Sequence, residues 1–288
     1  MSIQWFPGHM AKARRQVEER LKQVDVVMEL LDARLPLSSR NPMMQEILSG
    51  KPRLVLLNKY DLADANANRL WLEYFETRGI QAVLIDARTG KGVQLLPRLA
   101  AELIGDRQEH LQNKGIQKKT VRSMVVGIPN VGKSSLINRL AGRSAAKTGD
   151  RPGVTKAQQW IKVGRKMQLL DTPGILWPKF DDPVIGQRLA ASGAIKADIF
   201  PVEEVALFAV SYLRERYPDK LKERYQLDVL SEDSVYVLEE IGKRRGCVAS
   251  GGVVDWERAA DALLRDLQSG KLGRVTLEFP EDWTERAK

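Results

Sequence analysis

The chain has 288 residues, of which 43% are hydrophobic and 29% are charged, as in a globular protein with one large or two modest domains. Its single cysteine, Cys247, excludes an intramolecular disulfide and fits a reducing compartment. We find no signal peptide, no lipidation motif and no uncharged apolar run near the ~18 residues of a membrane span, so we expect a cytoplasmic protein without a membrane anchor.

Short apolar runs alternate with longer stretches of helical spacing in the first third of the chain. The expected helices span residues 10–24, 43–48, 69–77 and 93–105, and the expected strands span residues 25–31, 53–57 and 81–85. This alternation predicts an α/β protein with a mostly parallel sheet flanked by helices. A polar, basic connector follows at residues 106–120.

The strand expected at residues 53–57 leads directly into N-K-Y-D, a match to N-K-x-D. In this motif the aspartate carboxylate accepts hydrogen bonds from N1–H and the exocyclic amine of guanine. Adenine presents the wrong pattern, and a polar site left unpaired discriminates by about 10⁴-fold. We therefore expect Asn58, Lys59 and Asp61 to select guanine.

The strand expected at residues 81–85 ends in Asp86, Ala87 and Arg88. GTPases place a Ser-Ala-Lys-like loop at this point, and the alanine N–H of that loop meets guanine O6. We therefore expect Ala87 to bind the base. Asp86 departs from the pattern, because a serine is usual in its place.

Residues 127–134 read G-I-P-N-V-G-K-S between an apolar run and a stretch of helical spacing, which is the setting of a P-loop rather than of a plain glycine turn. In such a loop, backbone N–H groups and the helix N-terminus surround phosphate. Lys133 is expected to reach the β- and γ-phosphates and to act in catalysis, and Ser134 to ligate Mg²⁺. The other expected nucleotide contacts are Asn130, Val131, Gly132 and Ser135. The Asn130 side-chain oxygen is also placed to help hold a monovalent cation beside the γ-phosphate.

Residues 143–158 are polar and broken by glycine and proline, and strands are expected after them at residues 159–163 and 167–170. A mobile loop at this point is where switch I lies in GTPases, and one of its threonines is expected to bind Mg²⁺ in the GTP state. Thr148 and Thr155 are both candidates. We prefer Thr155 because it lies closer to the following strand.

Residues 171–174 read D-T-P-G. Asp171 is expected to support Mg²⁺, and Gly174 to offer its N–H to the γ-phosphate. The next residue is Ile175, whereas GTPases commonly have there a glutamine that orients the attacking water. His9 is our candidate for that task, since imidazole can orient water near neutral pH. The alternative is a histidine that only caps or packs.

The order of these motifs is unusual, because N-K-x-D precedes the P-loop whereas in an ordinary small GTPase it follows. All the loops belong to the carboxyl edge of one parallel sheet, and joining the old termini while cutting elsewhere leaves each loop in place. The sequence therefore predicts a circularly permuted P-loop GTPase domain over residues 1–178.

The alternation of strand and helix stops near residue 178. Helical spacing then recurs at residues 202–217, 231–245 and 255–269, with Pro218 and Gly246 as breaks. We expect a smaller α-helical domain over residues 179–288.

The net charge of +9 is unevenly distributed. Residues 1–177 hold 29 Lys and Arg against 16 Asp and Glu, whereas residues 178–288 hold 17 against 21. The basic excess indicates a polyanionic partner, nucleic acid before membrane. The alternative is a solvated basic surface whose charge offsets bound nucleotide.

Four further strings carry a family resemblance: W-F-P-G-H-M at residues 5–10, D-A-R at 32–34, G-D-R-P-G at 149–153 and I-L-W-P-K-F at 175–180. With the nucleotide motifs, they make the chain resemble the ribosome biogenesis GTPase A (RbgA/YlqF) family of circularly permuted GTPases nearly end to end. The resemblance implies a late assembly factor of the large (50S) ribosomal subunit whose helical C-terminal domain contacts ribosomal RNA.

The resemblance also implies that the N-terminal histidine, His9 here, replaces the missing glutamine. It implies that the large subunit and K⁺ stimulate hydrolysis, which is consistent with Asn130. We thus expect a monomer that binds GTP or GDP with Mg²⁺ and whose partners are ribosomal RNA and ribosomal proteins. The rivals are a binding protein in which hydrolysis is incidental and a GTPase that acts on tRNA or on a protein target. An ATPase is disfavoured by Asp61.

Overall fold

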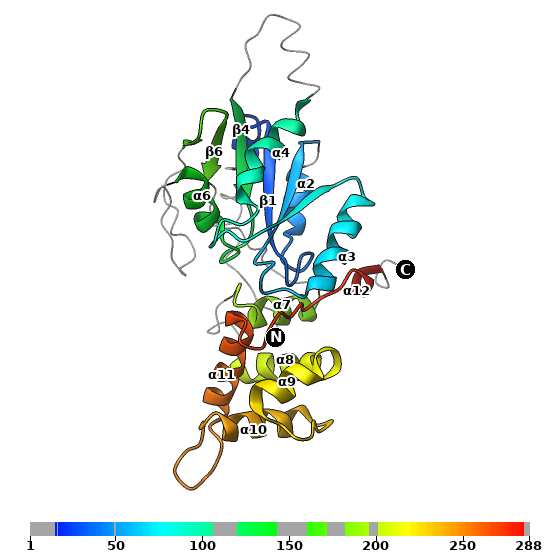
Figure 1. Ribbon diagram of the computed structural model, residues 1–288, viewed down its shortest axis with the longest axis vertical. Coiled ribbons are helices and arrows are strands. Elements are labelled where there is room, and N and C mark those ends of the chain that lie inside the picture. The colour runs from blue at the N-terminus through cyan, green and yellow to red at the C-terminus, as the bar shows by residue number, and fades with distance from the viewer. Residues whose placement is uncertain are drawn as a thin grey trace, which may run out of the picture.

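Six strands form one sheet, which occupies the upper part of the molecule in Figure 1. The structure is a computed structural model that describes residues 15, 17–48, 50–105, 120–142, 160–171, 182–195 and 201–284. The strands are β1 (Val26–Asp32), β2 (Arg53–Asn58), β3 (Gln81–Ile85), β4 (Val121–Val126), β5 (Trp160–Val163) and β6 (Met167–Asp171). Their order is β3-β2-β1-β4-β6-β5, and all neighbours are parallel except β5 and β6.

The strand order confirms the predicted permutation. If the strands are renumbered from β4, with β1 placed after β6, the sheet reads 2-3-1-4-5-6 from β5 to β3. In that numbering the chain starts in the middle of the sheet and winds first to one edge and then to the other, as doubly wound α/β folds do. The loops after β1, β2, β3, β4 and β6 lie at one edge of the sheet because these strands are parallel.

Helices cover both faces of the sheet. They are α2 (Pro42–Ile47), α3 (Ala65–Glu76), α4 (Leu96–Glu102) after the 3₁₀ turn η1 (Val93–Leu95), and α6 (Lys133–Ala141). Alternate strand residues point to opposite faces. Leu31 and Leu57 thus pack with Trp71 of α3 in a small core, whereas Leu30 and Leu56 belong to the larger core.

A helical layer lies below the sheet (Figure 1). It contains α7 (Pro183–Ala191), α8 (Val202–Arg216), α9 (Pro218–Tyr225), α10 (Ser234–Arg244) and α11 (Trp256–Ser269). The central helix, α8, packs against the other four. Aspartate side chains accept backbone N–H groups at the starts of α7, α10 and α11. None of the described helices has the length and apolarity that crossing a membrane requires.

Two of these helices begin at prolines. Pro218 was expected to break a helix, and it does end α8, but it also stands at the first position of α9. Pro183 starts α7 in the same way, behind the Asp182 cap. Proline suits this position because its missing N–H has no partner within a helix anyway.

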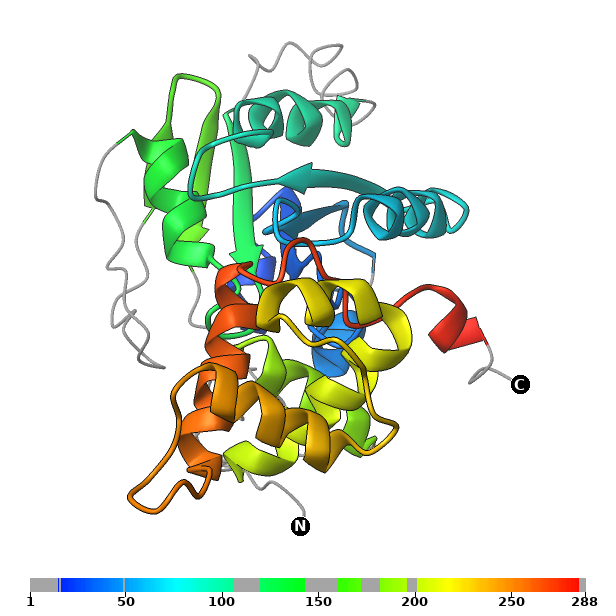
Figure 2. The ribbon, with the colours of Figure 1, turned by 60° about the horizontal axis from the view of Figure 1, so that its bottom comes forward.

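The C-terminal residues 275–284, here called the strap, return from the helical layer to the sheet and end in α12 (Glu281–Thr284). Figure 2 shows the strap leaving α11 and running outward to α12. Val275 N–H donates to the Leu62 carbonyl (2.9 Å), and Leu277 N–H donates to the Arg34 carbonyl (2.7 Å). The strap therefore lies on the loops after β1 and β2. The expected domain limit at residue 178 stays a prediction.

Candidate functional site

The structure brings three of the expected motifs together through one side chain, Asn58. Its Oδ1 accepts from the Ala87 N–H (2.9 Å) and its Nδ2 donates to the Val131 carbonyl (2.7 Å). Asn58 is buried at the end of β2, Ala87 follows β3, and Val131 belongs to the loop after β4. One amide thus holds the expected base loops against the expected phosphate loop.

The loop between β4 and α6 has the geometry of a phosphate cradle. Gly132 precedes α6 with φ 105°, and no side chain caps the helix. A Cβ on Gly132 would lie against the Asn58 amide, so the residue is confined to glycine by space as well as by φ. The first turn of α6 directs its N–H groups and the positive end of its dipole toward this loop, the usual setting of a bound anion.

Lys133 lies over this loop. Its Nζ donates to the carbonyls of Gly127 (3.0 Å) and Ile128 (2.6 Å), and the residue is buried. Ser134 and Ser135 follow in the first turn of α6, and both are half-buried. The cation and the two hydroxyl-bearing residues thus occupy the part of the loop where the sequence places the phosphates.

The P-loop asparagine makes a contact outside the sheet. Asn130 has φ 54°, and its Nδ2 donates to the Gly193 carbonyl at 3.4 Å. Gly193 lies in the turn that follows α7, so the P-loop touches the helical layer directly. The cation role expected for Asn130 stays a prediction.

Ion pairs connect the loops after β1 and β2. Lys59 Nζ lies 3.0 Å from Asp32 Oδ2, and Arg34 grips the same carboxylate through Nε (2.9 Å) and Nη2 (2.8 Å). Burial alone would raise the pKa of Asp32, but the charges and hydrogen bonds of Arg34 and Lys59 hold that pKa well below its usual range. Burial is also the main reason that the pKa of Lys59 is lowered. From the sequence, D-A-R was only part of a resemblance.

Asp86 shapes the loop after β3. Its carboxylate accepts from the N–H groups of Arg88 (2.8 Å) and Thr89 (3.2 Å) and from the Thr89 hydroxyl (2.5 Å). Burial opposes ionisation, but the hydrogen bonds from Thr89 and Arg88 lower the pKa of Asp86. These bonds explain the departure from serine, because a carboxylate accepts all three donors at once. The neighbouring N–H of Ala87 remains bound to Asn58.

Two arginines border this loop. The exposed Arg88 lies 3.5 Å from the Asp61 carboxylate, and Arg139 of α6 donates to the Arg88 carbonyl. The helix that follows the P-loop is thus bonded to the loop after β3. The carboxylate of Asp61, which is expected to bind guanine, has a cation beside it.

Several expected residues lie outside the described part of the chain: His9, Thr148, Thr155 and Gly174. Asp171 is the last residue of β6 and pairs in register with Val125 of the P-loop strand. This places its backbone beside the cradle. The expected roles of all these residues stay predictions.

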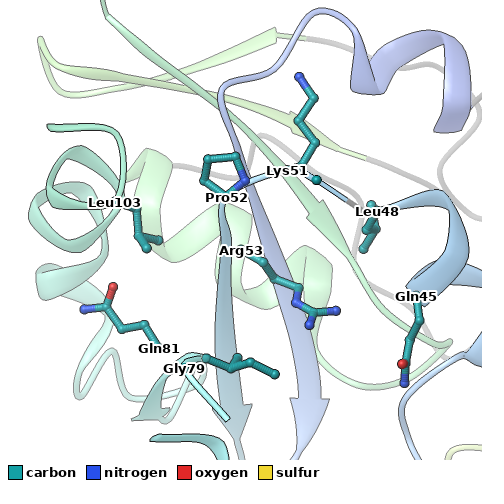
Figure 3. Close-up of a pocket in the computed structure, with 10 residues that line it drawn as sticks. Gln45, Leu48, Lys51, Pro52, Arg53, Gly79, Gln81 and Leu103 are labelled. Carbon is teal, nitrogen blue, oxygen red and sulfur yellow. The ribbon is translucent and has the colours of Figure 1, made fainter. Parts of the chain in front are cut away.

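A second hollow lies at the opposite, amino-terminal edge of the sheet (Figure 3). Its volume is about 590 Å³, and its walls include Lys51, Arg53 and Gln81. The Lys51 amine donates to the Val24 carbonyl (2.9 Å), and Arg53 lies 3.4 Å from Glu29. None of the residues that line this pocket belongs to a nucleotide motif, so it does not compete with the carboxyl edge as the nucleotide site.

Comparison with known proteins supports this assignment. The profile of a family described as 50S ribosome-binding GTPase matches residues 122–237. The chain is 53% identical to ribosome biogenesis GTPase A of Bacillus cereus, over 100% of this chain and 97% of that protein. The chain belongs to the ribosome biogenesis GTPase A family. It is also 31% identical to the member of that name from Thermotoga maritima, over 98% of this chain and 96% of that protein.

Solved structures agree with the family. The GNP-bound YlqF of T. maritima aligns with a TM-score of 0.65 at 27% identity, covering 94% of this chain and 99% of that one. The GDP-bound form aligns equally well, with a TM-score of 0.65 at 28% identity over 93% of this chain and 100% of that one. Membership of the ribosome biogenesis GTPase A family confirms the predicted enzyme class, a GTPase, and the predicted fold, a circularly permuted P-loop domain with a helical region after it.

Proposed function

We propose that this GTPase binds the assembling large ribosomal subunit, promotes its late maturation, and leaves after hydrolysing GTP to GDP and phosphate. Kinship over the whole chain with ribosome biogenesis GTPases carries the proposal. The excess of 13 positive charges in residues 1–177 supports contact with ribosomal RNA. We propose further that the subunit stimulates turnover and that the protein acts as a monomer in the cytoplasm.

We propose that the base is selected by Asn58, Lys59, Asp61 and Ala87. The ties of Asn58 to Ala87 and Val131 support this, since they hold the loops in a fixed relation. Guanine O6 would share the Ala87 N–H with Asn58 or displace it.

The phosphates and ions fit the cradle after β4. The N-terminus of α6 suits an anion, and Lys133 supplies a cation. Mg²⁺ prefers oxygen ligands, which hydroxyl, carboxylate and phosphate groups would supply here. We assign it to Ser134, Thr155 and Asp171, and K⁺ to Asn130. When bound, these ions would offset the charge that develops on the phosphates during hydrolysis.

For catalysis we propose that His9 orients the attacking water. Thr155 and Gly174 would respond to the γ-phosphate. Ile175 has no role in this proposal because its side chain has no polar atom. The attacking water is therefore oriented by a residue of the N-terminal segment.

The test is GTP turnover in K⁺ buffer, with and without large ribosomal subunits, for the wild type, His9→Ala and a matched control, His110→Ala. We expect His9→Ala to lower stimulated turnover about 10²-fold or more while GTP still binds. His110→Ala should behave as the wild type. Stimulation that survives His9→Ala would overturn the catalytic assignment alone. Absence of stimulation in the wild type would overturn the ribosomal partner and favour a tRNA or protein target.

A further inference from the structure

Asp32, Arg34 and Lys59 are here called the Arg34 cluster. Within it, Arg34 makes a contact beyond its ion pair with Asp32. The guanidinium of Arg34 is buried, and besides gripping Asp32 its Nη2 donates to the Ser192 carbonyl (3.0 Å). Its Nη1 is buried without a hydrogen-bond partner among the described residues. Such a buried group costs free energy, which the bonds of Arg34 to Asp32 and Ser192 have to offset.

One end of the cluster holds the loop after β2. Lys59 has φ 61°, a left-handed conformation that is strained for a residue with a side chain. The ion pair with Asp32 and the hydrogen bond from Ala33 N–H to the Asn58 carbonyl (2.8 Å) hold it there. The loop that carries Asn58 and Asp61 is therefore fixed from the β1 side.

The other end of the cluster reaches the helical layer. Ser192 and Gly193 form the turn after α7, and this turn receives Arg34 at one carbonyl and Asn130 at the next. Gln268 of α11 donates to the neighbouring Ala191 carbonyl (3.2 Å). The turn thus contacts the guanine side and the phosphate side of the nucleotide site and is anchored in the helices.

We propose that Arg34 is a positioning residue for guanine selection and that it links guanine binding to the seating of the Ser192–Gly193 turn. The inference rests on the proposed assignment of Asn58, Lys59 and Asp61 to the base. Linkage is reciprocal, so a guanine nucleotide stabilises the seated turn as much as the seated turn favours the nucleotide. Filling the base site thereby changes the stability of a turn in the helical layer.

The experiment measures dissociation constants for GDP and for inosine diphosphate, which lacks the exocyclic amine that Asp61 is proposed to accept. The variant is Arg34→Met, and the matched control is Arg188→Met. Arg188 is also buried and pairs with Glu278 and Asp282, and within the described part of the chain it has no bond to the cluster. The wild type should prefer GDP by about tenfold or more, because inosine leaves a carboxylate oxygen unpaired.

Arg34→Met should weaken GDP binding about tenfold and bring the ratio of the two constants close to one, whereas Arg188→Met should keep the wild-type ratio. Arg34→Lys, which leaves a cation on Asp32 without the second bond, should fall between them. Hydrogen exchange supplies the second readout. GDP should slow exchange at residues 189–195 in the wild type and in Arg188→Met, and leave it unchanged in Arg34→Met.

A wild-type ratio in Arg34→Met would overturn the inference while leaving the guanine assignment intact. A wild type that does not distinguish GDP from inosine diphosphate would overturn the assignment of Asp61 and the inference with it. If Arg34→Met does not fold, Arg34→Lys decides, because a wild-type ratio and wild-type exchange in that variant contradict the linkage.

Discussion

Two buried carboxylates, Asp32 beside the loop after β2 and Glu278 in the strap, have pKa values that are shifted in opposite directions. Both are almost fully buried and both pair with an arginine. The pKa of Asp32 is held well below its usual range, although burial opposes this, by the charges of Arg34 and Lys59. Burial raises the pKa of Glu278, and the charge of Arg188 and hydrogen bonds from Ser38 do not overcome it.

The number of cations explains the difference. Asp32 has two cations, and one of them makes two parallel hydrogen bonds to it. Glu278 has one, Arg188, at 3.2 Å, and that arginine also pairs with Asp282 at 3.0 Å. Nearby cations lower the pKa of a buried carboxyl group below its ordinary value only where they nearly balance its charge. The compensated carboxylate pairs with Lys59 in the loop after β2, whereas the under-compensated one joins the strap to the loop after β1.

The largest effect is expected at the better compensated site. Asp32→Asn removes the ion-pair partner of the buried Arg34 and of the partly buried Lys59, so the free energy of unfolding should fall by about 3–5 kcal/mol. Urea denaturation measures this directly. Asp261→Asn is the matched control, because Asp261 forms an exposed pair with Arg265 and should change stability by at most about 1 kcal/mol. Equal losses in the two variants would contradict the account.

A smaller effect is expected at the other carboxylate. Glu278→Gln removes the charge facing Arg188, but Arg188 keeps Asp282 and the amide oxygen keeps one acceptor for Ser38. The free energy of unfolding should fall by about 1–3 kcal/mol. Glu281→Gln, which alters an exposed pair with Arg216, serves as the control and should stay within about 0.5 kcal/mol of the wild type. A loss in Glu278→Gln as large as that in Asp32→Asn would remove the distinction between the two sites.

Most of the sheet could be predicted from the sequence, because its strands are continuous apolar runs bounded by turn signals. The strand expected at residues 81–85 is β3 as predicted, and the run expected at 25–31 is β1, displaced by one residue. The order of the nucleotide motifs was sufficient for the permutation. The starts of α7 and α9 were missed because a proline marks either the end of a helix or its first residue. The strap was missed because residues 275–284 have no periodicity.

The site was predictable where side chains carry the chemistry. Asn58 and Lys133 are identified by their motifs, but the partners that hold them are backbone carbonyls, which leave no trace in a sequence. The reach of Arg34 to the Ser192 carbonyl spans 158 positions and depends on how α7 docks. Asp86 is an intermediate case. Its mismatch with serine was visible, and its cause became clear only from the three donors around it.

The smallest effect is the pH dependence of the two carboxylates, which should have opposite signs. A group whose pKa is raised by folding binds its proton more tightly in the folded state, so Glu278 should lower stability as pH rises above the ordinary carboxylate range. Asp32, whose pKa is lowered, should lose its stabilising contribution only as pH falls below the ordinary carboxylate range. The Glu278 carboxylate faces Arg188, Ser38 and the Leu37 N–H, and Asp282 lies behind Arg188.

Urea unfolding of the wild type and Glu278→Gln, at pH values from the ordinary carboxylate range upward, measures the Glu278 contribution. The stability difference, wild type minus variant, should shrink steadily as pH rises, because only the wild type carries the group that ionises. Exposed carboxylates titrate alike in both proteins and cancel in the difference. A difference that grows with pH would mean that Ser38 and Arg188 outweigh burial, and Glu278 would then resemble Asp32 in sign.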